Sequence, residues 1–263
     1  EGRRKKEEGR RKKEEGRRKK EEGRRKKEEG RRKKEEGRRK LTDYRLPITD
    51  YRLPITMSLQ SLSILPKNNQ TPTGLLVILH GWGANYYDLF SLASELNLPD
   101  YAFEFPDAPF PHPDVPGGKM WYDLQSKDYQ GLTESRQILL EWLLSLEGKT
   151  GIPLSRTFLS GFSQGGAMIL DVGLTLPLAG LISMSGYLHF NPQLSDRALA
   201  PILMTHGNLD MVVPLKMAIA SREGLQSIGA SVEYHEFSGG HEIPRGVIQL
   251  IHDFVLKTIS NLG

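Results

Sequence analysis

Residues 156–172 read RTFLSGFSQGGAMILDV. The apolar start, Arg156–Ser160, predicts a buried strand, and Gln164–Val172 predicts a helix. Between them, Gly161-Phe162-Ser163-Gln164-Gly165 has the Gly-x-Ser-x-Gly spacing of a sharp strand-to-helix turn, which holds its serine in a strained backbone conformation. Such a turn needs small flanking residues, because the strand and the helix approach closely. An ordinary glycine-rich turn is the alternative, so the surrounding sequence has to support the interpretation.

Strands and helices are expected to alternate on both sides of this turn. Short apolar runs predict strands at Leu75–Leu79, Tyr101–Phe105, Arg156–Ser160, Leu181–Met184, Pro201–Thr205 and Val232–Phe237. Helices are predicted at Asp88–Leu96, Ser135–Leu146, Gln164–Val172, Leu215–Ile228 and Pro244–Ile259. Residues 105–118 are expected to form a proline-rich loop. Repeated alternation indicates an α/β fold with a mostly parallel central sheet and helices on both faces.

Composition divides the 263-residue chain into two parts. Residues 1–56 hold 25 lysines and arginines against 13 acidic residues, whereas residues 57–263 hold 11 against 19. The net charge of +4 is therefore an average, and it does not indicate that the whole chain binds nucleic acid. Residues 57–263 are long enough for one domain of moderate size with a substantial core. No cysteine is present, which excludes disulfides, thiolate metal sites and a cysteine nucleophile.

Residues 1–56 consist of two tandem repeats. Glu-Gly-Arg-Arg-Lys-Lys-Glu recurs through residue 40, and Thr-Asp-Tyr-Arg-Leu-Pro-Ile recurs over residues 42–56. Both have the period expected of a translated DNA heptamer, since tandem GAAGGAA and ACCGATT encode them. Our hypothesis is that residues 1–56 are translated simple-sequence DNA ahead of a start at Met57, and that they form a disordered or loosely helical tail. An intact mass of the native protein that includes them would contradict it.

The alternative is a functional basic tail that binds nucleic acid or an anionic membrane. Its glutamate pairs dilute the charge, and residues 1–40 contain no aromatic side chain for base stacking, so nucleic acid is not the expected partner. No secretory signal follows Met57, and the uncharged run of residues 172–195 is broken by glycines and prolines. We expect a cytoplasmic protein without a membrane span.

A serine hydroxyl becomes nucleophilic when an imidazole takes its proton and a carboxylate orients that imidazole. In folds with the turn described above, these groups follow in the order serine, acid, histidine. His241 follows the last predicted strand on a Ser-Gly-Gly turn, and Asp210 lies between it and Ser163, after the strand Pro201–Thr205. The competing residues stand inside helices or strands or in other loops: Asp171, Asp196, His80, His112, His189, His206, His235 and His252. The spacing therefore predicts a triad of Ser163, Asp210 and His241.

A glycine-rich turn, His80-Gly81-Trp82-Gly83-Ala84-Asn85, directly follows the first predicted strand. Turns at this position expose backbone N–H groups that can hold a developing oxyanion, together with the N–H of the residue after the nucleophile. We assign the backbone N–H groups of Trp82 and Gln164 to the oxyanion hole. A turn that binds nothing is the alternative, but four such segments in this order, each after its own strand, make coincidence a poor explanation.

With these motifs, residues 57–263 resemble the phospholipase/carboxylesterase family of α/β-hydrolases, which includes acyl-protein thioesterases and small bacterial carboxylesterases. The matching stretches are His80-Gly81-Trp82-Gly83, Trp121-Tyr122-Asp123, Gly161 to Gly166, His206-Gly207, Asp210 to Pro214 and Gly240-His241. The resemblance implies the same triad, no metal, no cofactor, and hydrolysis of carboxylic esters or acyl thioesters. Family members often carry a smaller aliphatic residue where this chain has Trp82, so a narrower acyl channel is expected.

We therefore expect a serine hydrolase that cleaves small to medium acyl esters through an acyl-enzyme. An acyl-protein thioesterase or lysophospholipase using the same site, another hydrolase on this fold, and a nucleic-acid-binding protein acting through the tail remain alternatives. Four apolar side chains are expected to line the substrate pocket, with ordinary core packing as the alternative: Phe110, Trp121, Phe162 and Met211. No basic cluster after residue 57 points to a phosphate-bearing substrate, and the oligomeric state is left open.

Overall fold

The computed structural model describes residues 59–66, 71–192 and 198–262. These residues belong to one compact unit, Met57–Gly263. The expectations for the repeat tail, residues 1–56, and for a start at Met57 lie outside the described residues.

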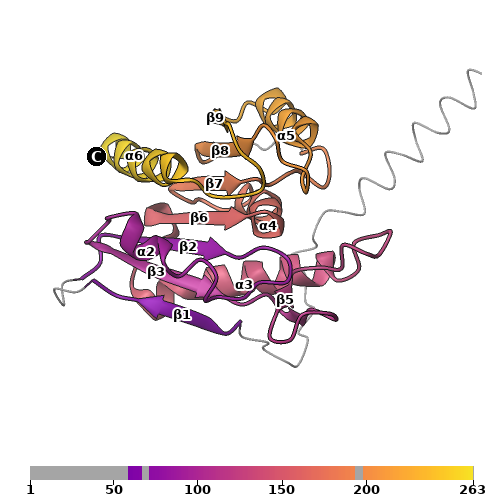
Figure 1. Ribbon diagram of the computed structural model, residues 1–263. Helices are drawn as coiled ribbons and strands as arrows, with labels where there is room; N and C mark the ends of the chain where they lie inside the picture. The colour runs from indigo at the N-terminus through magenta and orange to yellow at the C-terminus, as the bar shows by residue number, and fades with distance from the viewer. Residues whose placement is uncertain (1–58, 67–70, 193–197, 263) are drawn as a thin grey trace, which may run out of the picture. The chain divides into compact units, whose positions relative to one another are not determined.

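A seven-stranded sheet forms the centre of this unit, with the strand order β1-β3-β2-β6-β7-β8-β9 (Figure 1). The strands are β1 (Ser61–Ile64), β2 (Gly74–Leu79), β3 (Tyr101–Pro106), β6 (Thr157–Phe162), β7 (Gly180–Met184), β8 (Ile202–Gly207) and β9 (Val232–Phe237). All neighbouring pairs are parallel except β1 and β3, which are antiparallel. The carboxyl ends of six strands therefore meet at one edge of the sheet, where this class of fold places its sites.

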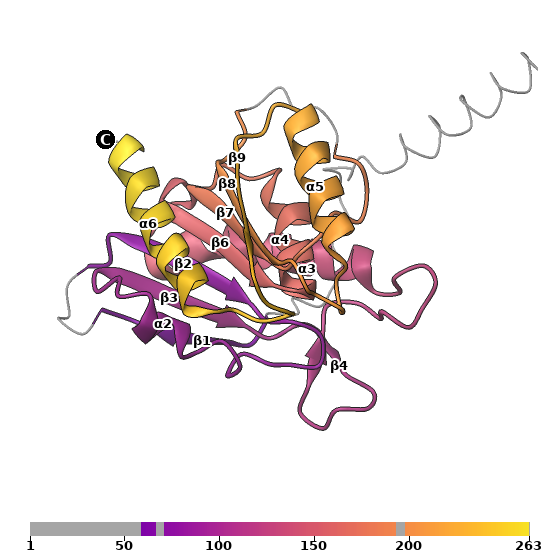
Figure 2. The ribbon, with the colours of Figure 1, turned by 45° about the horizontal axis from the view of Figure 1, so that its top comes forward.

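Helices cover both faces of the sheet, and in Figure 2 helix α6 crosses in front of it. The helices are α2 (Leu92–Glu95), α3 (Leu132–Thr150), α4 (Gln164–Gly173), α5 (Leu215–Ser227) and α6 (Arg245–Leu262), with a short 3₁₀ turn at Leu154–Arg156. Strand β2 shows how the core is divided, because its side chains alternate between the faces. Leu75, Val77 and Leu79 pack with side chains of α3 and α4, whereas Leu76 and Ile78 pack with those of α2 and α6.

The expected α/β-hydrolase fold is confirmed, and the predicted elements differ from the observed ones in three places. The antiparallel edge strand β1 was not predicted; it is short and alternates serine with Leu62 and Ile64, so it gives little apolar signal. The proline-rich loop also contains a small hairpin of β4 (Phe110–Pro111) and β5 (Lys119–Met120).

The predicted helix Asp88–Leu96 was wrong in its first half, because only α2, Leu92–Glu95, is helical. Side-chain acceptors hold the preceding turn in another conformation: the N–H of Tyr86 donates to Asp107 Oδ1, and the N–H of Tyr87 donates to Asn85 Oδ1. Local side-chain hydrogen bonds of this kind compete with helix formation.

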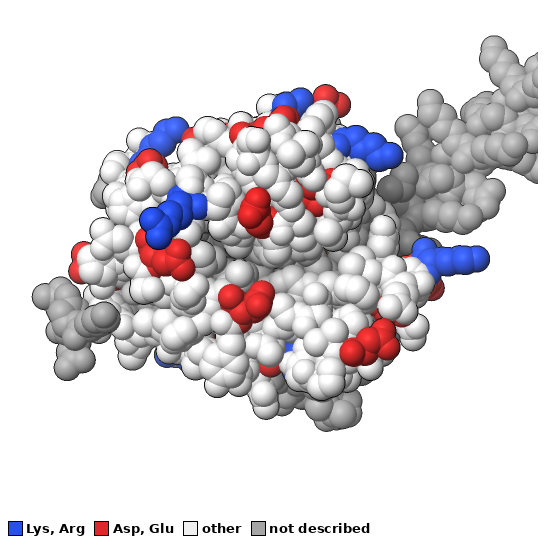
Figure 3. All heavy atoms as spheres, viewed as in Figure 1, with Lys and Arg blue, Asp and Glu red and all other residues white. Residues whose placement is uncertain are grey.

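Charge is sparse on the surface of the described residues. On the face shown in Figure 3, their basic and acidic side chains are interspersed, and no broad basic patch is visible among them. Among the described residues, no helix is both long and apolar enough to cross a bilayer.

Candidate active site

Ser163 lies where β6 ends and α4 begins, at the carboxyl edge of the sheet. Its φ of 55° is in the left-handed region, which is the strained conformation expected of this turn. Two glycines allow the close approach of strand and helix. A Cβ on Gly161 would lie 2.4 Å from backbone atoms of Gly165, and a Cβ on Gly165 would lie 2.4 Å from the carbonyl oxygen of Leu79. No larger residue fits at either position without a backbone shift.

Asp210 and His241 meet at the same edge, in the segments after β8 and β9. The Nδ1–H of His241 donates to Asp210 Oδ2 at 2.7 Å. The Asp210 side chain is fully buried, whereas the His241 side chain retains 17% of its exposure. A carboxylate only accepts hydrogen bonds, so this contact places the proton on Nδ1 and leaves Nε2 of His241 available as a base.

The carboxylate of Asp210 is held ionised by its surroundings. Burial alone would raise the pKa of Asp210, but hydrogen bonds from His241 and from the N–H groups of Val213 and Val212 outweigh it and hold the pKa below its usual value. Both N–H groups donate to Oδ1 at 2.8 Å, so each carboxylate oxygen has its own partners. Such a carboxylate can orient His241 and stabilise the imidazolium without taking its proton.

His241 lies next to the residue that precedes Ser163. The ring of Phe162, the residue before Ser163, lies 4.7 Å from the His241 ring, centroid to centroid. No hydrogen bond joins Ser163 to His241 within the described residues. Contacts between nucleophile and base often tighten only when substrate is bound, so this geometry is compatible with proton transfer from Ser163.

The turn after β2 lies against Ser163. A Cβ built on Gly81 would lie 3.4 Å from the Cβ of Ser163, which is ordinary contact distance. The backbone N–H groups of Trp82 and Gln164 donate to no other group in the described part of the chain. Gln164 is the first residue of α4, where helix N–H groups lack intrahelical acceptors and favour negative charge. The two expected oxyanion donors therefore belong to two segments that are distant in the sequence, one in contact with Ser163 and the other directly after it.

The four expected pocket residues are placed very differently. Phe162 is half-buried beside His241, and Phe110 is half-buried in β4. Met211 is 91% exposed, on the segment directly after Asp210. Trp121 is 0% exposed, so it belongs to the core and contributes no open wall. The structure thus brings Phe162 and Met211 near the candidate triad and places Trp121 beneath it.

Two histidines that sequence reasoning left without a role support this edge from below. His80 follows β2, and His206 is the last residue but one of β8; both are 1% exposed. The Nε2–H of His206 donates to the carbonyl of Val213 at 2.8 Å and lies 3.5 Å from Asp210 Oδ2. The available signal was a His-Gly pair at or just after the end of a strand, which both share (His80-Gly81 and His206-Gly207).

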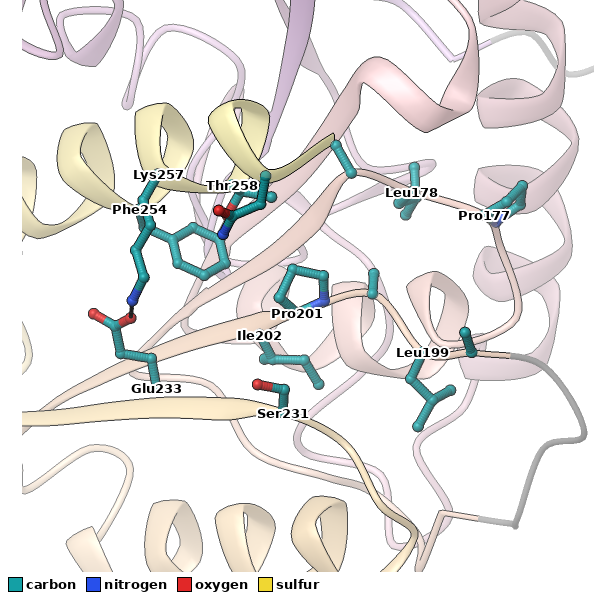
Figure 4. Close-up of a pocket in the computed structure, with 14 residues that line it drawn as sticks. Pro177, Leu178, Leu199, Pro201, Ile202, Ser231, Glu233, Phe254, Lys257 and Thr258 are labelled. Atoms are coloured by element: carbon teal, nitrogen blue, oxygen red, sulfur yellow. Dashed lines mark hydrogen bonds and ion pairs between the residues drawn. The ribbon is translucent and has the colours of Figure 1, made fainter. Parts of the chain in front are cut away.

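A large opening lies at the other edge of the sheet. Its volume is about 480 Å³, and its walls come from the segments before β7 and β8, the start of β9, and the end of α6 (Figure 4). Most of the lining is apolar, and an ion pair of Lys257 with Glu233 borders it. Among the residues that the structure describes, no group of three or more histidine, aspartate or glutamate side chains could hold a metal ion.

Comparison with known proteins agrees with this architecture. The family model for Phospholipase/Carboxylesterase matches residues 61–259. Acyl-protein thioesterase 1 of Neurospora crassa is 31% identical over 219 residues, covering 73% of this chain and 89% of the relative. Acyl-protein thioesterase 1 homolog 1 of Dictyostelium discoideum is 29% identical, covering 75% and 96%.

Solved structures are similar as well. The crystal structure of esterase PE8 has a TM-score of 0.69 at 29% identity, covering 76% of this chain and 98% of that one. The Bacillus cereus carboxylesterase, at 17% identity and a TM-score of 0.67, shares the fold. The chain belongs to the phospholipase/carboxylesterase family of α/β-hydrolases.

Proposed function

We propose that this enzyme is a serine hydrolase that cleaves carboxylic esters with small to medium acyl groups, using Ser163, His241 and Asp210. One observation carries the proposal. The buried, hydrogen-bonded pair of Asp210 and His241 lies at the same sheet edge as a serine in a strained turn. The environment also lowers the pKa of Asp210, as the orienting role requires.

In the proposed reaction, His241 Nε2 takes the proton of the Ser163 hydroxyl as its oxygen forms a bond to the substrate carbonyl carbon. The N–H groups of Trp82 and Gln164 hold the oxyanion of the tetrahedral intermediate. The bond to the leaving alcohol breaks, and His241 donates the proton to that oxygen. In the second half, His241 takes a proton from water as the water oxygen attacks the acyl carbon. The bond to Ser163 then breaks, His241 returns the proton to the Ser163 oxygen, and the carboxylic acid leaves.

The size of the acyl group is inferred from Trp82. Its indole packs edge-on against His112 from the proline-rich loop, with ring centroids 4.2 Å apart. A bulky ring in this position, next to the expected oxyanion donor, leaves less room than an aliphatic side chain would. This supports short acyl chains over long ones.

Thioester hydrolysis is the second candidate. Several curated relatives are named acyl-protein thioesterases, including one of Schizosaccharomyces pombe that is 35% identical over 187 residues. The same triad would serve, because a thiol leaves from the tetrahedral intermediate more readily than an alcohol. Large apolar side chains next to Asp210 are exposed, namely Leu209, Met211 and Val212, and they offer a surface for a larger acylated substrate.

Hydrolysis of p-nitrophenyl acetate, butyrate and octanoate, beside butyryl and palmitoyl thioesters, tests both candidates. The full chain is expected to cleave acetate and butyrate fastest, and Ser163→Ala is expected to reduce turnover on the order of 10⁶-fold. A preference for palmitoyl thioester would replace the first candidate by the second. Activity that persists in Ser163→Ala would contradict both.

A further inference from the structure

We propose that Trp121 is a positioning residue for the oxyanion hole. Its indole N–H and its backbone N–H hold the two chain segments that carry the oxyanion donors of Trp82 and Gln164. The inference rests on the function proposed above, since it concerns the same site. It explains why Trp121 is buried rather than part of a pocket wall.

Trp121 is itself fixed by its surroundings. It follows β5 directly, and its side chain is fully buried in the core beneath the site. The hydroxyl of Ser135, on α3, donates to the carbonyl oxygen of Trp121. Its indole N–H and its backbone N–H also donate hydrogen bonds within the protein, as described below. A side chain held in this way can act as a rigid support for neighbouring loops.

The indole fixes the first oxyanion segment. Trp121 Nε1–H donates to the carbonyl oxygen of His80 at 3.0 Å, and His80 Nδ1–H donates to the carbonyl oxygen of Gly81 at 2.7 Å. The Gly81 carbonyl and the N–H of Trp82 belong to the same planar peptide unit, so fixing one fixes the direction of the other. Trp121 therefore acts on the Trp82 donor through His80.

This arrangement requires His80 to be neutral. Its Nε2 accepts from the N–H of Ala108 at 3.0 Å, so the single ring proton resides on Nδ1 and points at Gly81. Burial lowers the pKa of His80, which keeps the ring neutral at physiological pH. Asp107 lies 3.9 Å from Nε2, and its charge opposes that shift only in part.

The backbone of Trp121 fixes the second oxyanion segment. Its N–H donates to Gln164 Oε1 at 2.9 Å, and Gln164 Nε2–H donates to the carbonyl oxygen of Tyr122 at 2.7 Å. The Gln164 side chain is thereby held at both ends by two consecutive residues. Because Gln164 begins α4, anchoring its side chain also fixes the backbone N–H at the start of the helix.

The two segments also touch. A Cβ on Gly165 would lie 2.6 Å from the carbonyl oxygen of His80, which is the oxygen that accepts from the Trp121 indole. One residue thus holds the donors of Trp82 and Gln164 at a fixed separation. Donors fixed before the reaction stabilise an oxyanion without reorganisation, which is the main source of their effect.

Trp121→Phe tests this role in the full chain, with Trp142→Phe as a matched control. The change removes the indole N–H while keeping an aromatic ring and the backbone N–H. Trp142 is also buried, on α3 in the same core cluster, and lies outside the proposed oxyanion support. Three quantities are measured: kcat and KM for p-nitrophenyl butyrate, and the Ki of an alkyl boronic acid that forms a tetrahedral adduct on serine.

Trp121→Phe is expected to lower kcat about 10- to 100-fold, because donors displaced by a fraction of an ångström lose much of their effect. KM should stay within about threefold, and the boronic acid Ki should rise by the same factor as kcat falls. Trp142→Phe should leave kcat, KM and Ki unchanged. An unchanged kcat and Ki in folded Trp121→Phe, or a rise in KM alone, would overturn the positioning role.

Wild-type behaviour separates this inference from the proposed function. If the wild type neither cleaves esters nor binds the boronic acid, the proposed function fails and the inference fails with it. If the wild type cleaves esters and binds the boronic acid, and Trp121→Phe has the same kcat and Ki, the inference alone fails. Should Trp121→Phe not fold, Ser135→Ala decides: it loosens Trp121 without a change in bulk at the site. It is then expected to lower kcat at constant KM, whereas an unchanged kcat would refute the proposal.

Discussion

The two edges of the parallel sheet differ in what they offer a ligand. The edge at the strand amino ends has the opening of about 480 Å³ with mostly apolar walls, and the charged residues in its lining form a solvent-exposed ion pair, with Lys257 68% exposed. The edge at the carboxyl ends has the strained Ser163, the buried pair of Asp210 and His241, and hydrogen-bonded support beneath them. The carboxyl edge is therefore the candidate site, because it holds preorganised polar groups, whereas the opening at the amino edge is lined mostly by apolar side chains.

The largest effect that separates the two edges is expected at Asp210. Asp210→Asn should lower kcat by roughly 10⁴ at pH 7, because the amide no longer stabilises the imidazolium of His241. Asp253→Asn, at an exposed position on α6, is the matched control and should leave kcat within twofold. Steady-state ester hydrolysis by the two variants measures the difference. A loss of less than tenfold in Asp210→Asn would place the acid elsewhere.

Two glycine substitutions are expected to change the free energy of unfolding in opposite directions. Gly161→Ala puts a Cβ 2.4 Å from backbone atoms of Gly165, so it should destabilise the fold by roughly 1–3 kcal/mol and reduce activity. Gly148→Ala, in helix α3, meets nothing within 4 Å and should stabilise it by about 0.5–1 kcal/mol. Urea unfolding of both variants measures the two shifts. Equal shifts would show that the turn at Ser163 is less tightly packed than described.

The buried His80 predicts a dependence of stability on pH. Its folded-state pKa is lowered from 6.5, so the unfolded chain takes up a proton that the folded chain refuses. The contribution of His80 is complete above pH 6.5 and declines as the pH falls from there through the lowered pKa. The free energy of unfolding of the wild type should thus fall more steeply than that of His80→Gln below pH 6.5. Parallel curves would contradict a neutral, buried His80.

The smallest effect is expected at the amino edge. Lys257→Gln breaks the ion pair with Glu233, whose atoms lie 3.1 Å apart. Exposed pairs contribute little, so the free energy of unfolding should change by less than about 1 kcal/mol. Ester hydrolysis should stay within twofold of the wild type, since no support of the site passes through this pair. A large loss of kcat would show that the amino edge takes part in catalysis.

The elements that could be predicted from the sequence are those determined by a local pattern of residues. The apolar runs of β2, β6 and β8 are buried on both faces, and the glycines around Ser163 are required by contacts below 3 Å. The strand β1 and the first half of the predicted helix Asp88–Leu96 depend on pairing and on hydrogen bonds with distant residues. A single sequence gives no sign of either.

The candidate site divides in the same way. The chain order of Ser163, Asp210 and His241 follows from strand ends, and the structure brings Asp210 and His241 into hydrogen-bond contact. Trp121 was expected on a pocket wall as one of four apolar side chains, and core packing, the alternative, is what the structure shows. Its burial and its contact with His80 depend on how the chain folds, because Ser135 and His80 lie 14 and 41 residues away from it in the sequence.

Covalent labelling of Ser163 tests the central claim most directly. The full chain is treated with an alkyl fluorophosphonate, and its intact mass and tryptic peptides are measured beside those of Ser163→Ala. We expect one adduct per chain, located on Ser163, with loss of ester hydrolysis in proportion to labelling and no adduct in the variant. Folded protein that hydrolyses esters without labelling at Ser163, or that is labelled at another residue, would contradict it.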